Sequence, residues 1–351
     1  MVRLGISVVI PCHNGVERLP ATLAHIAAQR VPRGVPWEVI LVDNASTDGT
    51  PGAARAWPDP PPAPLRIVSE PRLGLSFAHF AGFAAARHEI VSFVEDDNWI
   101  APDWLQVVSE IMAAHPDVGA CGGQNEAHFS TPAPAWFEQY AHYYAVGVQG
   151  PEEGGDITWT RGYLWGAGMT VRARAWRQLV DGGFGFLLED RVGGRLTTGG
   201  DSELSFALRL AGWKLRYEPR LRLRHDLPAR RLRWPYLCAL AGGMGAASVG
   251  LEPYLRVSHE AGRPRAETLG VLWLWQAVAR TLALARRPAA LLGFMLGGRE
   301  GDPRDLEVAR ELGRIDELLR SRGAFDRSIG AIRTAAWRRS LVGASARAGA
   351  A

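Results

Sequence analysis

The chain has 351 residues, of which 47% are hydrophobic and 22% are charged, a composition that predicts a globular protein of one large domain or two. Its net charge of +4 suits an anionic partner, such as a nucleotide or a phospholipid surface. Three widely spaced cysteines exclude a disulfide framework and a metal knuckle, and the first residues carry no secretory signal. We therefore expect a protein of the reducing cytosol.

Strand and helix patterns alternate along the first hundred residues. Apolar runs predict strands at 6–10, 37–42, 65–68 and 90–94. Between these runs, the spacing of apolar residues predicts helices over 19–29 and 76–87. Alternation of this kind predicts a mostly parallel, Rossmann-like sheet with helices on both faces.

An acidic cluster, Glu95-Asp96-Asp97, directly follows the fourth of these strands. Adjacent carboxylates repel one another, so the cluster predicts a positive partner, and Mg²⁺ and Mn²⁺ prefer oxygen ligands. The carboxyl ends of strands are also where α/β sheets bind ligands, and the polar turn 43–49 lies at such an end too. The alternative for the acidic cluster is a solvated turn that caps a helix beginning near Pro102.

Further candidate residues lie in the second half of the chain. Asp201 follows two glycines and precedes a predicted helix over 204–211. A carboxylate there suits a general base that takes a proton from an incoming hydroxyl, and a helix N-cap is the alternative. His225 follows a predicted strand over 213–219 and is either a metal ligand or a surface imidazole. The aromatic residues between 136 and 144 either pack inside the fold or stack on a ligand.

The ordered set of motifs resembles glycosyltransferase family 2, whose members have the GT-A fold and use nucleotide-sugar donors. Residues 6–14 and 42–49 look like the two nucleotide loops, and Glu95-Asp96-Asp97 looks like the metal-binding acidic motif of the family. Gly200-Asp201 lies where the family usually has Glu-Asp, whose Asp is the catalytic base. Leu232-Arg233-Trp234 keeps only the end of the Gln-x-x-Arg-Trp signature of processive polysaccharide synthases.

The resemblance implies a role for each matching residue. Asp201 is expected to be the catalytic base, while Asp97 and His225 are expected to hold Mn²⁺ or Mg²⁺ on the donor diphosphate. We expect Arg72 to bind that diphosphate as well. The other residues expected to bind the donor are Pro11, His13, Asn14, Asp43, Glu95 and Asp96.

The implied activity is an inverting, metal-assisted transfer of a hexosyl group from a UDP-, GDP- or dTDP-sugar to an acceptor hydroxyl. The acceptor is expected to be a glycan or a lipid-linked molecule of cell-surface polysaccharide or glycolipid synthesis. The alternative is a relative that binds nucleotide-sugar with little or no activity, which is suggested by Gly200. A nucleic-acid partner is not expected, because the arginines form no stripe with interleaved aromatic residues.

We predict a GT-A domain over residues 1–235 and a mainly helical region over 236–351. The uncharged runs within 269–296 are about a dozen residues long, shorter than the ~20 that span a bilayer, and arginines flank them. This pattern predicts helices that lie in the membrane interface, on the cytoplasmic face of the inner membrane. A buried helical pair or a dimer contact is the alternative.

Overall fold

The computed structural model describes residues 4–188, 198–259 and 270–338. The chain folds into two compact units, and each unit is discontinuous in sequence. The first unit consists of Met1–Arg177 and Trp213–Leu232, and the second of Gln178–Gly212 and Arg233–Ala351. Asp201 therefore belongs to the unit that contains the carboxy-terminal helices. The domain boundary that the sequence suggests after residue 235 stays a prediction.

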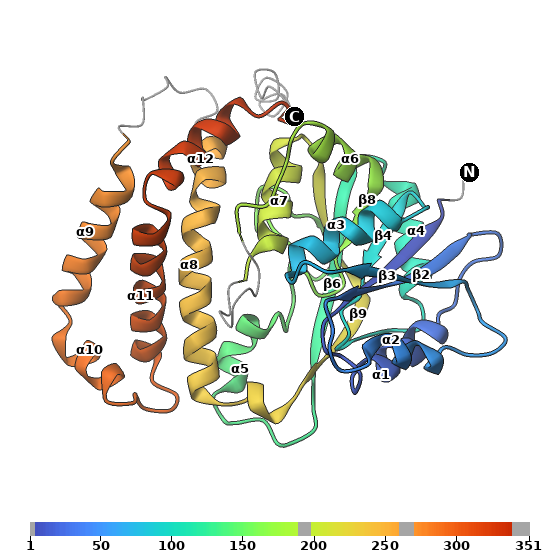
Figure 1. The fold of residues 1–351 in the computed structure, drawn as a ribbon, viewed down its shortest axis with the longest axis horizontal. Helices are drawn as coiled ribbons and strands as arrows, with labels where there is room; N and C mark the ends of the chain where they lie inside the picture. The colour runs from blue at the N-terminus through green and yellow to red at the C-terminus, as the bar shows by residue number, and fades with distance from the viewer. Residues whose placement is uncertain (1–3, 189–197, 260–269, 339–351) are drawn as a thin grey trace. The chain divides into compact units, whose positions relative to one another are not determined.

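The first unit is built around a nine-stranded sheet (Figure 1). Its strands are β1 (Ile6–Cys12), β2 (Trp37–Asn44), β3 (Leu65–Glu70), β4 (Ile90–Phe93), β5 (Asn98–Ile100), β6 (Val118–Phe129), β7 (Gly155–Asp156), β8 (Thr170–Arg172) and β9 (Lys214–Leu227). Their order is β3-β2-β1-β4-β8-β6-β9-β5, and β7 pairs with β9. The predicted α/β class is confirmed. The sheet is mixed, because β8 runs antiparallel to both of its neighbours, β4 and β6.

Helices flank the sheet and turn apolar side chains toward it. The longer ones are α1 (Leu19–Ala27), α3 (Leu75–Ala85), α4 (Trp104–Ala114) and α6 (Ala173–Asp181), and the short ones are α2 (Thr50–Ala53) and α5 (Phe137–Tyr140). Leu23 and Ile26 of α1 are fully buried in the core that contains β1. Burial of one such side chain stabilises the fold by about 1.5–3 kcal/mol. The Trp, Phe and Tyr residues between 136 and 144 are buried too, which favours the packing alternative for them.

Strand β9 extends well beyond the predicted strand over 213–219. It pairs with β6 from Lys214 to Leu227, and with β5 near its carboxyl end. Pairing with β5 places His225 opposite Asn98, the residue that follows the acidic cluster. The length of β9 therefore brings His225 to the acidic cluster.

The second unit is helical, as predicted for the carboxy-terminal region. Its helices are α7 (Gly200–Leu210), α8 (Trp234–His259), α9 (Leu272–Ala285), α10 (Pro288–Met295), α11 (Pro303–Ser321) and α12 (Gly323–Thr334). Helix α11 lies between α8 and α9 (Figure 1). Glycines let α8 and α11 approach closely, because a side chain at Gly245 would overlap the backbone carbonyl of Arg310.

Candidate active site

The loops that follow β1 and β2 meet at the carboxyl edge of the sheet, because the two strands pair in parallel. The amide of Thr47 donates to Asn14 Oδ1 at 2.8 Å, and His13 Nδ1 donates to the carbonyl of Asn44 at 2.7 Å. Asp43 is the last but one residue of β2 and lies at the base of the second loop. The structure therefore brings together His13, Asn14 and Asp43, three of the residues that the sequence assigns to the donor.

Arg72 lies just after β3, beside the loop that follows β2. Asn44 Nδ2 donates to the carbonyl of Arg72 at 2.6 Å and so ties the two loops together. The Arg72 guanidinium pairs with Glu70 at 2.8 Å and lies over the Phe77 ring. Its side chain is 63% exposed, so an anion can reach it from solvent. Pro11, by contrast, is buried within β1.

The three carboxylates of the acidic cluster have different surroundings. Asp96 accepts hydrogen bonds from Arg18 Nη2 at 2.7 Å and from the Cys12 thiol at 3.1 Å, so its charge is compensated inside the fold. Glu95 is half-buried, and its carbonyl accepts the amide of Asn98 in the turn. Asp97 is 3% exposed and faces β9.

Asp97, His225 and Arg231 form a buried group that we call the Asp97 cluster. Arg231 Nη1 lies 3.0 Å from Asp97 Oδ2 and 3.2 Å from His225 Nε2. His225 Nε2 is 3.6 Å from the same carboxylate oxygen. His225 Nδ1 donates to the carbonyl of Tyr144 at 2.9 Å, so Nε2 presents its lone pair to the guanidinium. A carboxylate oxygen and an imidazole nitrogen therefore converge on one cation position.

The donor atoms of the Asp97 cluster fit a divalent ion. Mn²⁺ accepts carboxylate and imidazole ligands, and a metal-ligating histidine usually donates its other ring N–H to a group such as the Tyr144 carbonyl. Such a site is completed by waters and substrate phosphates. Among the residues that the structure describes, no group of three or more His, Cys, Asp or Glu side chains could hold a metal. Asp97 and His225 are thus the two candidate protein ligands of a divalent ion.

Asp201 lies in the first turn of α7, in the second unit. The helix begins at Gly200 and its N-cap is Gly199, whose φ of +114° favours glycine. The N-cap alternative for Asp201 is therefore wrong. Asp201 Oδ1 accepts the amide of Ser202 at 2.7 Å, and its negative charge is favourable at the amino end of a helix. Its role as catalytic base stays a prediction.

Glu203 anchors the same helical turn. Its fully buried carboxylate accepts hydrogen bonds from the amides of Leu187 and Leu188 and from the hydroxyl of Tyr254, at 2.7–3.0 Å. Burial raises the pKa of Glu203 to about 7, and the three donors partly oppose that rise. This carboxyl group joins the start of α7 to α8 and to the segment before α7.

We expect Glu203 to make stability depend on pH. Because folding raises its pKa above the ordinary 4.5, its contribution to stability is complete below pH 4.5 and is lost as the pH rises through about 7. The free energy of unfolding should fall by about 3 kcal/mol over this range, relative to Glu203→Gln. Urea unfolding at several pH values measures the difference. Tyr254→Phe keeps the buried carboxyl group and should keep the slope, whereas equal slopes in wild type and Glu203→Gln would contradict the prediction.

Several residues of these groups carry no distinct signal in the sequence. Arg18 and Arg231 are two among many arginines, and Glu203 resembles an ordinary acid in the first turn of a helix. The nearest sequence signal for Arg231 is the adjacent Leu232-Arg233-Trp234, which keeps the end of a family signature. The partners of Arg231 and Glu203 depend on the register of β9 and on the packing of α7.

Parts of the chain are similar in sequence to known proteins. Residues 7–164 match the family model described as "Glycosyl transferase family 2". A dodecaprenyl-phosphate galacturonate synthase from Rhizobium johnstonii is 31% identical over 150 residues, which are 42% of this chain and 44% of that protein. An undecaprenyl-phosphate 4-deoxy-4-formamido-L-arabinose transferase from Pectobacterium carotovorum is 32% identical over 114 residues, 32% of this chain and 34% of that protein. The chain thus spans less than half the length of either relative.

Solved structures with a similar fold include a glycosyltransferase complex. It is the mannosyltransferase PcManGT from Pyrobaculum calidifontis in complex with GDP-Man and Mn²⁺, with a TM-score of 0.52 and 20% identity. The likeness covers 95% of this chain and 88% of that one, and it supports the GT-A fold. The match over residues 7–164 shows that this part of the chain is similar to glycosyltransferase family 2, and the fold is the GT-A fold.

Proposed function

We propose that this chain is an inverting glycosyltransferase that moves a sugar from a nucleotide-sugar to an acceptor hydroxyl, with the help of a divalent metal. The observation that carries the proposal is the convergence of Asp97 Oδ2 and His225 Nε2 on one cation position. That position lies just after β4, which is next to β1 in the sheet. The loop after β1 contains His13 and Asn14, which we assign to binding the nucleotide-sugar. A charged donor diphosphate needs a cation at such a place.

Different residues of the first unit bind different parts of the nucleotide-sugar donor. Asp43 accepts from the base or ribose, and Pro11, His13 and Asn14 shape the same pocket. Because Asp96 is neutralised by Arg18, we assign Glu95 to the ribose, and Asp96 to holding the turn in place. The exposed guanidinium of Arg72 binds the diphosphate. A metal held by Asp97 and His225 would offset the charge that develops on the departing nucleoside diphosphate.

Asp201 completes the proposed reaction as general base. It takes the proton of the acceptor hydroxyl, whose oxygen attacks the anomeric carbon from the face opposite the leaving group. One displacement inverts the configuration at that carbon. A screen of UDP-, GDP- and dTDP-sugars for nucleoside diphosphate release, with and without Mn²⁺, tests the function. Donor binding without release would favour the alternative of a nucleotide-sugar-binding relative.

A lipid phosphate is a second candidate acceptor. The names of the two relatives from Rhizobium johnstonii and Pectobacterium carotovorum both include a polyprenyl phosphate. A phosphate oxygen is already an anion at neutral pH, so its attack on the anomeric carbon needs no general base. Transfer to a hydroxyl therefore requires Asp201 as general base, whereas transfer to a lipid phosphate does not.

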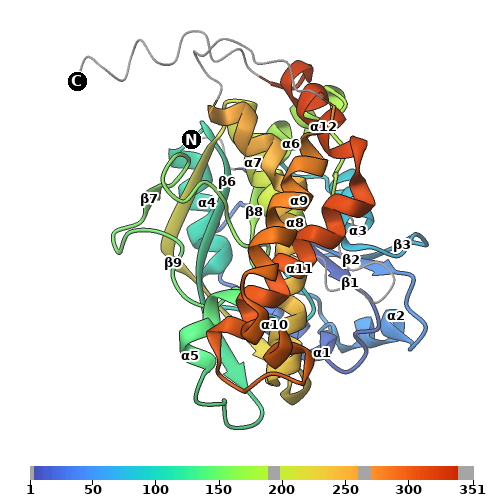
Figure 2. The same cartoon turned by 90° about the vertical axis from the view of Figure 1, so that its left-hand side faces the viewer.

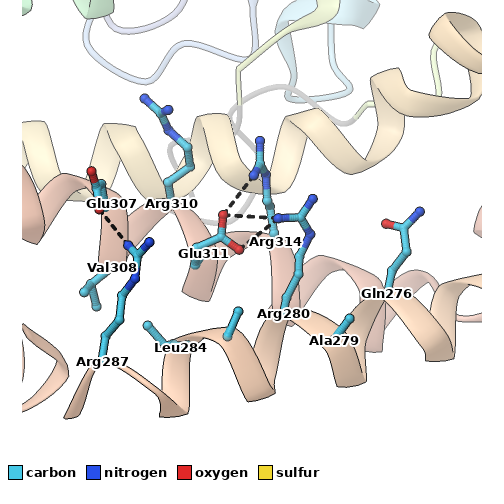
Figure 3. A pocket seen from close by; sticks show the side chains of 11 residues that line it. Gln276, Ala279, Arg280, Leu284, Arg287, Glu307, Val308, Arg310, Glu311 and Arg314 are labelled. Carbon is cyan, nitrogen blue, oxygen red and sulfur yellow. Dashed lines mark hydrogen bonds and ion pairs between the residues drawn. The ribbon is translucent and has the colours of Figure 1, made fainter.

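A membrane surface is part of the proposal, because Arg280, the one charged residue of α9, turns inward. Arg280 pairs with Glu311 at 3.0 Å and Arg287 pairs with Glu307 at 2.8 Å, across a pocket of about 550 Å³ between α9 and α11 (Figure 3). None of the residues that line this pocket is one that we assign to the donor or the metal. We therefore assign no ligand to this pocket. The ion pairs across it hold α9 and the residues after it against α11.

The outward face of α9 is apolar. The exposed large apolar side chains of α9, its N-cap and the α10 region are Val271, Leu274, Trp275, Val278, Leu282, Leu292, Met295 and Leu296. Figure 2 views the molecule from the side of α9 and α10. Those of α9 recur every three or four residues and so form one stripe along the helix. This exposure disfavours a buried helical pair, and a contiguous exposed apolar surface marks a protein or membrane contact.

We commit to anionic lipid as the partner of this stripe. Arg286 is exposed at the carboxyl end of α9, where it suits acidic headgroups. Among the described residues, no helix has both the length and the apolarity to cross a bilayer, so the contact would be peripheral. Leu269, at the start of the predicted segment, lies outside the described residues.

Replacing both Trp275 and Leu282 by Ser should weaken binding to phosphatidylglycerol vesicles about 10-fold or more, because it removes two large apolar side chains from the contact. Co-sedimentation at low salt measures the affinity, and added salt should weaken it by screening. Leu319→Ser changes an equally apolar, exposed residue on α11 and should bind as wild type does. A wild-type protein that stays unbound at low salt, or that forms a dimer through this stripe, contradicts the assignment.

A further inference from the structure

The guanidinium of Arg231 lies where the proposed divalent ion would lie. We propose that Arg231 is a tethered counter-ion that a divalent metal must displace, so that this side chain sets the metal affinity of the Asp97 cluster. The inference rests on the proposed function, which assigns a metal to Asp97 and His225.

Arg231 and a metal would use the same two atoms. Arg231 Nη1 is within 3.2 Å of both Asp97 Oδ2 and His225 Nε2, the atoms that would ligate the ion. The side chains of Asp97, His225 and Arg231 are 3%, 10% and 14% exposed, so two cations have little room or solvent to share. Without either cation, Asp97 would be a buried charge without its cationic partner, which is strongly unfavourable.

The position of Arg231 is set by its backbone. The residue ends the short 3-10 turn Ala229–Arg231, and its amide donates to the carbonyl of Pro228 at 2.8 Å. The hydroxyl of Tyr144 donates to the carbonyl of Arg231 at 2.9 Å, while the carbonyl of Tyr144 accepts from His225. Tyr144 therefore keeps the two residues side by side. The long arginine side chain can swing away by rotation about its own bonds, without moving β9.

Mn²⁺ titration followed by electron paramagnetic resonance, in the absence of any donor, tests the inference. Arg231→Gln should bind Mn²⁺ about 10-fold more tightly than wild type, or better, which corresponds to about 1.4 kcal/mol. Arg230→Gln is the matched control, because it removes the same charge from the adjacent, exposed residue. Solvent and salt screen the charge of Arg230, so the Kd of Arg230→Gln for Mn²⁺ should stay within about twofold of the wild-type Kd.

Thermal unfolding separates the counter-ion from a merely structural role. Arg231→Gln without metal should have a lower Tm than wild type, because Asp97 has lost its cation. Saturating Mn²⁺ should restore that Tm, and its effect should be larger in the variant than in wild type. A Tm loss that Mn²⁺ does not restore would mean that Arg231 only supports the fold, and would overturn the inference.

Asp97→Asn serves as the blank, so that failure of the inference can be told from failure of the metal assignment. Asp97-dependent Mn²⁺ binding with equal Kd in wild type and Arg231→Gln would overturn the inference alone. If neither protein shows Asp97-dependent binding, both the inference and the assignment of the metal to Asp97 and His225 are wrong. Tighter, Asp97-dependent binding in Arg231→Gln supports both.

Discussion

Asp97→Asn should lower donor turnover about 1000-fold or more, and EDTA should do the same to the wild-type protein. A bound metal contributes several kcal/mol of stabilisation to the charge on a leaving diphosphate, and each 1.4 kcal/mol is a factor of ten in rate. Asparagine keeps the size of Asp97 but not the charge that holds the ion. Release of nucleoside diphosphate from the best donor measures the loss.

Two controls make this result specific. Asp226→Asn removes a neighbouring carboxylate that pairs with His128 at 2.9 Å, and it should keep turnover within about threefold. Added Mn²⁺ should restore the EDTA-treated wild type but not Asp97→Asn. Full turnover in chelator would remove the metal from the proposed reaction.

Asp201→Asn should cut transfer to a hydroxyl acceptor by about 100-fold or more, the usual scale for loss of a general base. Donor affinity and Mn²⁺ affinity should change little, because we assign Asp201 to neither ligand. If Asp201 only supports α7 through the helix dipole, the same change costs at most about 1 kcal/mol of stability and leaves turnover intact. Product formation and Tm, measured on the same preparation, distinguish the two roles.

The activity of Asp201→Asn can also be compared between a hydroxyl acceptor and a polyprenyl phosphate acceptor. With a polyprenyl phosphate as acceptor, the attacking oxygen carries no proton to remove, so Asp201→Asn should retain most of the activity. A large loss with a hydroxyl acceptor supports the proposed base. Near-normal transfer to a lipid phosphate, together with no transfer to hydroxyl acceptors by wild type, would assign the chain to the second acceptor class and reject Asp201 as base.

The local elements and the edge of the sheet where the site lies follow from the sequence alone. The predicted strands over 6–10, 37–42 and 90–94 are mostly apolar runs that end before Pro11, Asp43 and Glu95, and their carboxyl ends must meet if they are parallel. The loops that contain His13, Asn14 and Asp43 do meet, as that rule requires. These features are local or follow from chain direction, so periodicity and turn chemistry suffice to predict them.

Which charges face one another was decided only by the tertiary structure. Asp96 and Asp97 are adjacent in sequence, yet Asp96 pairs with Arg18 and Asp97 with Arg231, because successive side chains leave the turn in different directions. The long strand β9 pairs with β5 and brings His225 to Asp97, and no local pattern predicts that register. The apolar stripe of α9 faces outward because Arg280 of α9, and Arg287 just after it, pair with glutamates of α11. Contacts between residues far apart in sequence depend on register and packing, which periodicity within one segment cannot specify.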